Sequence, residues 1–153
     1  MYGVAKVHKE GVPLRPILAM IGSPQHATTK WLAQVLEPVS TKYSRYVVKD
    51  SFAFSESISR IKTSRSAHMC TFDIKSLFTN VPLDKTIKIC TEQLYHSEIE
   101  VPTLSEKSFV KLMEKVTKGV EFSFDGVMFK QTDGVAMGSP LGPVLAKYLR
   151  GIS

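Results

Sequence analysis

Cysteine and histidine are scarce in this sequence, and their placement excludes several kinds of site. The 153 residues include two cysteines, Cys70 and Cys90, which form no CxxC pair, so a disulfide framework and a redox motif are excluded. Two cysteines without metal-ligand spacing and four scattered histidines also argue against a zinc cluster. We therefore expect both cysteines to be free thiols in a reducing compartment.

Long apolar stretches are equally absent. No hydrophobic run is long enough to cross a membrane, and the first ten residues, MYGVAKVHKE, lack the apolar core of a signal peptide. The sequence also lacks internal repeats, low-complexity segments and linkers. We expect one intracellular domain, cytoplasmic or nuclear, with a modest hydrophobic core.

Acidic residues are outnumbered by basic ones. The sequence has 14 Asp and Glu against 20 Lys and Arg, which gives a formal net charge of +6. An excess of positive charge favours an anionic partner, and nucleic acid is the commonest candidate. Two adjacent aspartates occur nowhere in the sequence, which bears on any site that must hold two metal ions.

The most informative stretch is residues 68–84, HMCTFDIKSLFTNVPLD. Its β-branched and aromatic residues predict a strand over Met69–Ile74, with Cys70 and Phe72 on one face and Asp73 on the other. A carboxylate late in an apolar strand is costly without a partner, and a bound cation is one partner that would explain Asp73. The alternative is that Asp73 caps a turn at the end of the strand.

Two further stretches carry chemistry. Residues 2–17 predict a β-hairpin that turns at Lys9-Glu10-Gly11 and gathers basic residues, although a solvated surface hairpin fits the composition equally well. Residues 131–146, QTDGVAMGSPLGPVLA, place three glycines before a predicted helix, which is typical of an anion or nucleotide platform. They match neither the Walker A loop nor the dinucleotide fingerprint, and an ordinary turn before a helix is the alternative.

Hydrophobic periodicity predicts the remaining elements. Helices are expected at 28–39, ended by Pro38, and at 51–61, 83–95 and 106–118. A second hairpin is expected around Asp125-Gly126, and Trp31 is expected in the core. Charged and aromatic residues alternate in a stretch that fits either a nucleic-acid track or a surface loop running into a helix: Arg45, Tyr46, Lys49, Phe52 and Phe54. The basic residues that follow, Arg60, Lys62 and Arg65, fit either contacts to nucleic-acid phosphates or a solvated face.

Three stretches, taken in order, resemble motifs of reverse transcriptases, and most closely those of Penelope-like retroelements. KVHKEGVPLRPI resembles the fingers hairpin, FDIKSLFTNVP resembles motif A, and GVAMGSPLGP resembles motif B. The resemblance covers nearly the whole chain. It implies an α+β fold, the partial fingers–palm of a right-hand polymerase, with an antiparallel palm sheet flanked by helices. Residues 1–66 would be the fingers portion and residues 67–153 the palm portion.

The resemblance also implies roles for individual residues. Asp73 would be the catalytic residue and, with the backbone carbonyl of Ile74, would bind Mg²⁺ or Mn²⁺; Phe78, five residues after Asp73, would be the steric gate under the sugar. Arg15 would contact the triphosphate, which suits its planar fork of donors. The nucleotide-binding residues implied in this way are Lys6, Lys9, Arg15, Ile74, Phe78, Gly138, Ser139 and Pro140. The implied partners are an RNA template, a DNA primer and deoxynucleoside triphosphates, with no membrane and no obligate protein partner.

Part of the family's machinery has no counterpart in this sequence. In that family further carboxylates come from a downstream Asp-Asp motif, which this sequence lacks, as it lacks a thumb. We therefore expect a truncated RNA-directed DNA polymerase that is inactive alone. The alternatives are a non-catalytic nucleic-acid-binding remnant or domesticated domain, and an unrelated basic domain without a nucleotide site.

Overall fold

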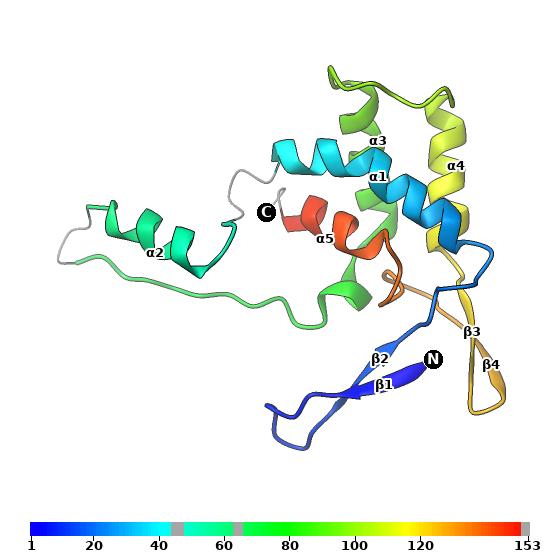
Figure 1. The fold of residues 1–153 in the computed structure, drawn as a ribbon, viewed down its shortest axis with the longest axis horizontal. Helices are drawn as coiled ribbons and strands as arrows, with labels where there is room; N and C mark the ends of the chain where they lie inside the picture. Colours follow the sequence, from blue (N-terminus) through cyan, green and yellow to red (C-terminus); the bar gives the residue numbers. More distant parts are fainter. Residues whose placement is uncertain (44–47, 63–65, 151–153) are drawn as a thin grey trace.

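Four helices with one apolar face each form the main hydrophobic core. In the computed structural model, which describes residues 1–43, 48–62 and 66–150, these are α1 (His26–Tyr43), α3 (Leu83–Tyr95), α4 (Glu106–Thr117) and α5 (Gly142–Arg150). On α3 the buried residues Ile87, Cys90 and Leu94 recur every three or four positions, so one face of the helix points inward. Figure 1 shows the four helices packed into one body.

The contact between α1 and α5 combines apolar packing with polar bonds. Tyr148 is 1% exposed, and its hydroxyl donates a hydrogen bond to the carbonyl of Leu36 at 3.1 Å, which satisfies the polar atom inside the core. An ion pair between Lys147 and Glu37 lies beside this bond. The fully buried apolar residues around it include Leu32, Val39, Phe109, Met113, Leu141 and Leu145.

Local capping sets the ends of the shorter helices. Ser105 precedes α4, and its hydroxyl accepts a hydrogen bond from the backbone N–H of Ser108, while Gly119 follows the helix with a φ of 65°. Asp50 caps α2 (Ser51–Ser59) by accepting from the N–H of Ala53 at 2.8 Å. The helices predicted at 51–61, 83–95 and 106–118 are confirmed within one or two residues. Among the described helices, none combines the length and the apolar character that a membrane crossing requires.

Two separate antiparallel hairpins make up the β-structure of the described ranges, and both were predicted. The first pairs β1 (Tyr2–Ala5) with β2 (Leu14–Ile17), and the second pairs β3 (Glu121–Phe124) with β4 (Val127–Lys130). Asp125 and Gly126 both have positive φ, as a two-residue turn of this handedness requires. The mixed α+β class is therefore confirmed.

Two predictions about α1 are wrong. The helix passes through Pro38 and continues to Tyr43, because the turn that follows the proline buries Val39 and Ser40 in the core. The proline ring itself is exposed, and the hydroxyl of Ser40 donates back to the carbonyl of Glu37. Trp31 is 38% exposed and lies on the surface, because neighbouring positions of the helix, such as Leu32, face the core instead.

The strand predicted over Met69–Ile74 is also wrong. The segment has no strand assignment, and no described residue pairs with its backbone. A β-strand is defined by bonds to a neighbouring strand, so β-propensity alone does not make one. An antiparallel palm sheet centred on this segment is accordingly not formed by the described parts of the chain.

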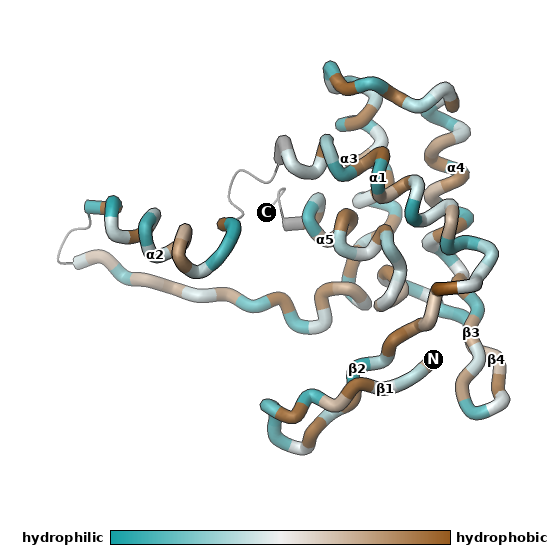
Figure 2. Tube along the Cα trace, in the orientation of Figure 1, coloured by the Kyte–Doolittle hydropathy of each residue, from teal (hydrophilic) through white to brown (hydrophobic). Residues whose placement is uncertain are grey.

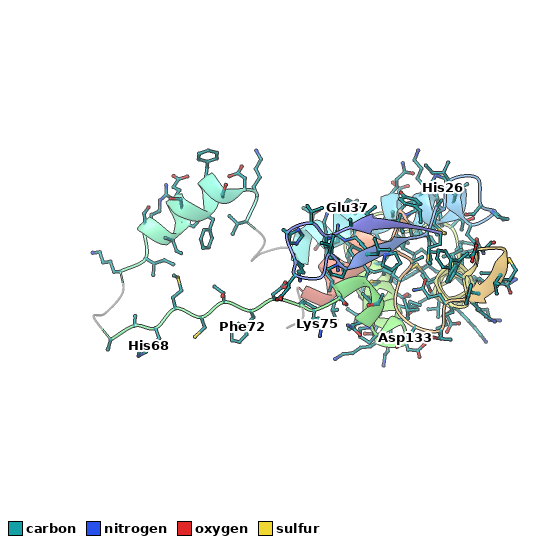
Figure 3. All side chains as sticks on the ribbon, turned by 90° about the horizontal axis from the view of Figure 1, so that it is seen from below. His26, Glu37, His68, Phe72, Lys75 and Asp133 are labelled. Carbon is teal, nitrogen blue, oxygen red and sulfur yellow. The ribbon has the colours of Figure 1, made fainter. Side chains whose placement is uncertain are left out.

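This segment and α2 together form an exposed arm, residues 48–62 and 66–76, that extends away from the helical body (Figure 1). Phe72 is 95% exposed, and Figure 3 shows its ring directed away from the rest of the protein. Apolar residues recur along the arm in Figure 2.

Cys70, expected in a core strand, is exposed, whereas Cys90 is buried on α3. Arg45, Tyr46 and Arg65 lie outside the described residues.

Replacing Phe109 with alanine is expected to lower the free energy of unfolding by about 3–5 kcal/mol, because a fully buried ring leaves a cavity. Phe52→Ala is the matched control, since this ring is 85% exposed on α2, and its effect should stay within about 0.5 kcal/mol. Urea denaturation followed by circular dichroism measures both. Similar losses in the two variants would contradict the assignment of the core.

The two cysteines are expected to differ in reactivity towards a thiol reagent. Burial raises the pKa of the Cys90 thiol, so this group has little thiolate and little access to solvent, while Cys70 is exposed. The native protein should therefore release one equivalent of chromophore from an aromatic disulfide reagent, and the unfolded protein two. Cys70→Ser should abolish the reaction of the native protein and Cys90→Ser should preserve it; the reverse pattern would place the arm residues in a buried strand after all.

Candidate nucleotide-binding site

A cavity of about 790 Å³ opens between the first hairpin and residues 73–78, where the end of the arm runs into the next turn. It receives residues from three stretches that are far apart in the sequence. The hairpin contributes Lys6, His8, Lys9, Pro13, Arg15 and Ile17; the second stretch contributes Asp73, Ile74, Lys75, Ser76, Leu77 and Phe78; the glycine-rich loop contributes Met137. Six of the residues predicted from the sequence therefore line one cavity.

The hairpin wall follows from strand alternation. Arg15 and Ile17 lie on the same side of β2 and both line the cavity, whereas Pro16 lines a smaller pocket of about 400 Å³ on the other side. Beyond the strands, the N–H of Lys6 donates to the carbonyl of Pro13 at 3.0 Å, which extends the pairing towards the turn. The predicted turn is present, because the N–H of Val12 donates to the carbonyl of Lys9.

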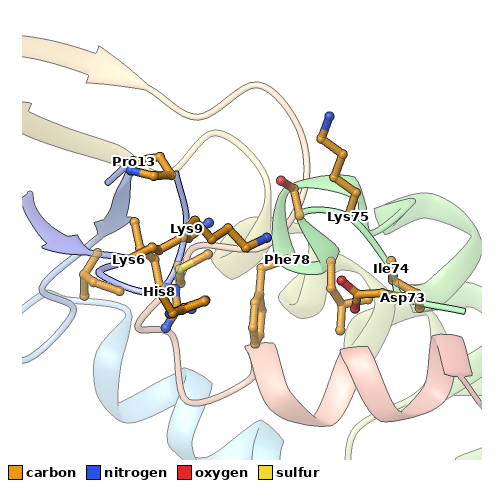
Figure 4. Close-up of a pocket in the computed structure, with 13 residues that line it drawn as sticks. Lys6, His8, Lys9, Pro13, Asp73, Ile74, Lys75 and Phe78 are labelled. Carbon is orange, nitrogen blue, oxygen red and sulfur yellow. The ribbon is translucent and has the colours of Figure 1, made fainter. Parts of the chain in front are cut away.

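The opposite wall ends in a single turn of 3₁₀-helix, η1 (Leu77–Asn80). The side chain of Asn80 donates to the carbonyl of Lys75 at 3.0 Å, and the hydroxyl of Thr79 donates to the carbonyl of Ser76. Polar side chains therefore close this turn through local hydrogen bonds. The turn places Phe78 half-buried at the cavity wall. Figure 4 shows Lys6, His8 and Lys9 on one side and Asp73, Ile74 and Phe78 on the other.

The glycine-rich loop joins the two walls by backbone hydrogen bonds. The N–H of Val135 donates to the carbonyl of Phe78 at 2.7 Å, and the N–H of Leu18 donates to the carbonyl of Met137 at 2.7 Å. Gly134 has a φ of 70°, and a Cβ atom added there would lie 2.6 Å from the Phe78 carbonyl oxygen. The close approach of the loop to η1 therefore requires glycine.

Three residues predicted to bind nucleotide, Gly138, Ser139 and Pro140, do not line the cavity. They follow Met137, which does. Ser139 is buried, and its hydroxyl accepts from the N–H of Leu141 at 3.4 Å, while its carbonyl accepts from the N–H of Gly142. The hydrogen bonds of Ser139 therefore lie at the start of α5, whereas Gly138 packs against the first hairpin, where an added Cβ atom would clash with the Leu18 carbonyl oxygen.

Asp73 is exposed, and among the residues that the structure describes it is the single carboxylate that lines the cavity. Within residues 1–43, 48–62 and 66–150, no group of three His, Cys, Asp or Glu side chains is placed to hold a metal ion. One carboxylate and one backbone carbonyl, that of Ile74, are too few hard oxygen ligands for two Mg²⁺ ions. The residues that the structure describes therefore do not fit a two-metal centre.

Sequence reasoning assigned no site role to seven lining residues: His8, Pro13, Ile17, Lys75, Ser76, Leu77 and Met137. Neither His8 nor Lys75 could have been found from strand alternation, because His8 lies in the turn beyond β1 and Lys75 follows a segment that is not a strand. The ammonium group of Lys75 points away from Lys9 and Asp73 in Figure 4. Met137 carries no signal in the sequence, because only the loop contact with Leu18 brings it to the cavity.

Comparison with known proteins identifies no relative of this chain: no protein-family model, no curated protein and no solved structure matches it.

Gly134→Ala is expected to destabilise the protein more than Gly11→Ala, although both glycines have a φ of 70°. At Gly11 the added methyl group meets nothing, so the cost is the backbone strain alone, about 1–2 kcal/mol. At Gly134 the clash with the backbone of η1 adds about 1–3 kcal/mol. Chemical denaturation of both variants measures the difference, and equal losses would show that the loop does not contact η1.

Proposed function

We propose that the cavity binds a nucleoside triphosphate and that the chain is the nucleotide-binding part of an RNA-directed DNA polymerase of the reverse transcriptase type. The observation that supports this proposal is that residues from separate motifs line one cavity. Arg15, Asp73 and Phe78 come from the stretches that resemble the fingers hairpin and motif A, and all three line the same cavity. A chance resemblance in two short stretches gives no reason for their residues to converge.

The cavity offers suitable partners for each part of a nucleotide. Arg15, Lys6 and Lys9 supply cationic donors for a triphosphate, and guanidinium binds phosphate oxygens in pairs. The ring of Phe78 packs against the start of α5, where a Cβ atom added at Gly142 would lie 3.3 Å from it. A ring held in this way is a firm wall against which a sugar hydroxyl would clash.

The proposed reaction is the template-directed transfer of deoxynucleotides from their triphosphates to a primer 3′-hydroxyl. In a complete polymerase, Mg²⁺ or Mn²⁺ supplies charge neutralisation at the transferred phosphate. Asp73 would provide one oxygen ligand and Ile74 a backbone carbonyl. Because the described residues hold no second carboxylate at the cavity, binding is proposed for these residues and no chemical step is derived from them.

A non-catalytic role in binding nucleic acid is the second candidate. The observation that favours it is the same shortage of carboxylates, together with the net charge of +6. A remnant that binds RNA or DNA through phosphate contacts would lose affinity steadily as salt is added. It would show no preference between dATP and ATP, which separates it from the first candidate.

Phe78 is expected to set the preference between deoxyribose and ribose. The unaltered protein should bind dATP about tenfold more tightly than ATP, because the 2′-hydroxyl collides with the ring. In Phe78→Val the ratio of the two dissociation constants should approach one. Isothermal titration calorimetry in buffer with Mg²⁺, and again with excess EDTA, measures both nucleotides.

Two controls make this test decisive. Phe129→Val is the matched variant, because this ring is 45% exposed on β4 and does not line the cavity, so the ratio should not change. Chemical denaturation shows whether Phe78→Val remains folded. If neither nucleotide binds in either buffer, the proposed function is overturned. Equal affinities of the unaltered protein for dATP and ATP overturn the assignment of Phe78 and favour the second candidate.

A further inference from the structure

Positive charge at the cavity is concentrated on one wall. Lys6, Lys9 and Arg15 all come from the first hairpin, and His8 stands between the two lysines. The opposite wall contributes the carboxylate of Asp73 and the ammonium of Lys75, which points away from Lys9 and Asp73 in Figure 4. The hairpin wall therefore carries three positive charges, and the facing wall carries one carboxylate and one ammonium group.

The arrangement is unfavourable for a divalent cation. A metal ion between the walls would gain the attraction of one exposed carboxylate, Asp73, and would meet the repulsion of three cations on the facing hairpin. Mg²⁺ binds through several oxygen ligands in a defined geometry, and the described side chains that line the cavity supply two oxygen-bearing groups, the Asp73 carboxylate and the Ser76 hydroxyl. A polyanion in the same place would be attracted by the three cations of the hairpin and repelled by one carboxylate, that of Asp73.

We propose that the cavity binds the triphosphate group of a nucleotide in its metal-free form, and that Mg²⁺ weakens this binding. The inference rests on the proposed function, because it concerns the same site and the same ligand class. A divalent ion chelated by the triphosphate cancels part of the negative charge that Lys6, Lys9 and Arg15 attract. It also occupies phosphate oxygens that the guanidinium group of Arg15 would otherwise contact in pairs. The cationic side chains of the hairpin neutralise the charge of the phosphates, which a bound metal ion does in other nucleotide sites.

The test compares dATP, inorganic tripolyphosphate and adenosine by isothermal titration calorimetry at constant ionic strength, with Mg²⁺ or with excess EDTA. Ionic strength must be fixed because salt alone screens exposed charges. In EDTA, dATP and tripolyphosphate should each bind about three- to tenfold more tightly than in Mg²⁺, from the charge difference alone. Adenosine, which lacks phosphate, should bind weakly and equally in the two buffers.

Arg15→Gln removes one cation from the hairpin wall and should weaken binding of tripolyphosphate in EDTA by about tenfold. It should also shrink the difference between the two buffers. Arg15 is exposed, so the substitution leaves the core intact, and Lys6→Gln provides a second variant. Lys111→Gln is the matched control, because this exposed lysine on α4 lies outside the cavity, and its dissociation constants should not change.

The outcomes separate the two proposals. Binding of dATP that requires Mg²⁺, or that is equally tight with and without it, overturns the metal-free inference and leaves the proposed function standing. Binding of tripolyphosphate in EDTA without any binding of dATP supports an anion site on the hairpin but overturns the nucleotide function. Failure of all three ligands in both buffers overturns both proposals.

Discussion

The hydrogen bond from the Val135 N–H to the Phe78 carbonyl is the contact on which the candidate site depends. At 2.7 Å it fixes the glycine-rich loop against η1, and the neighbouring bond between Leu18 and Met137 fixes the same loop against the first hairpin. Among the described residues, no hydrogen bond joins the hairpin directly to η1. Without the loop between them, the two walls would have no defined separation and the cavity no defined volume. The helical body supports this arrangement from behind, because α5 begins directly after the loop and is buried against α1 and α3.

The charge distribution gives the site its chemical character. Strand alternation places Arg15 and Ile17 on the cavity side of β2, and a tight turn returns the chain so that Lys6 and Lys9 face the same space. The opposite wall is formed by a turn whose hydrogen bonds are local, which leaves Asp73 exposed to solvent. An electropositive wall that faces an aromatic ring suits a ligand with an anionic end and a planar or cyclic body. A nucleotide is such a ligand, and neither a bare metal ion nor an apolar molecule is.

Sequence alone predicted the features that depend on interactions between residues close together in the chain. The bounds of α3, the cap at Ser105 and the turn at Asp125 follow from periodicity, side-chain hydrogen bonding and positive φ, all of which act within a few residues. The pairing of residues 69–74 could not be decided locally, since a strand needs a distant partner and the described chain provides none. For the site, Arg15, Asp73 and Phe78 were found through the resemblance to reverse transcriptases. His8 and Met137 reach the cavity through tertiary contacts, and the burial of Ser139 reflects its role at the start of α5.

The distance along the chain between the partners of the loop contacts has a consequence for folding. Phe78 and Val135, like Leu18 and Met137, are separated by many residues, and contacts of such separation form after local helices and turns because closing a long loop costs entropy. During synthesis both hairpin strands and η1 leave the ribosome well before the glycine-rich loop that joins them. The cavity is therefore among the last parts of the protein to form. A ligand that binds only the finished cavity cannot guide the early steps, but it would slow unfolding by holding together the two walls that meet last.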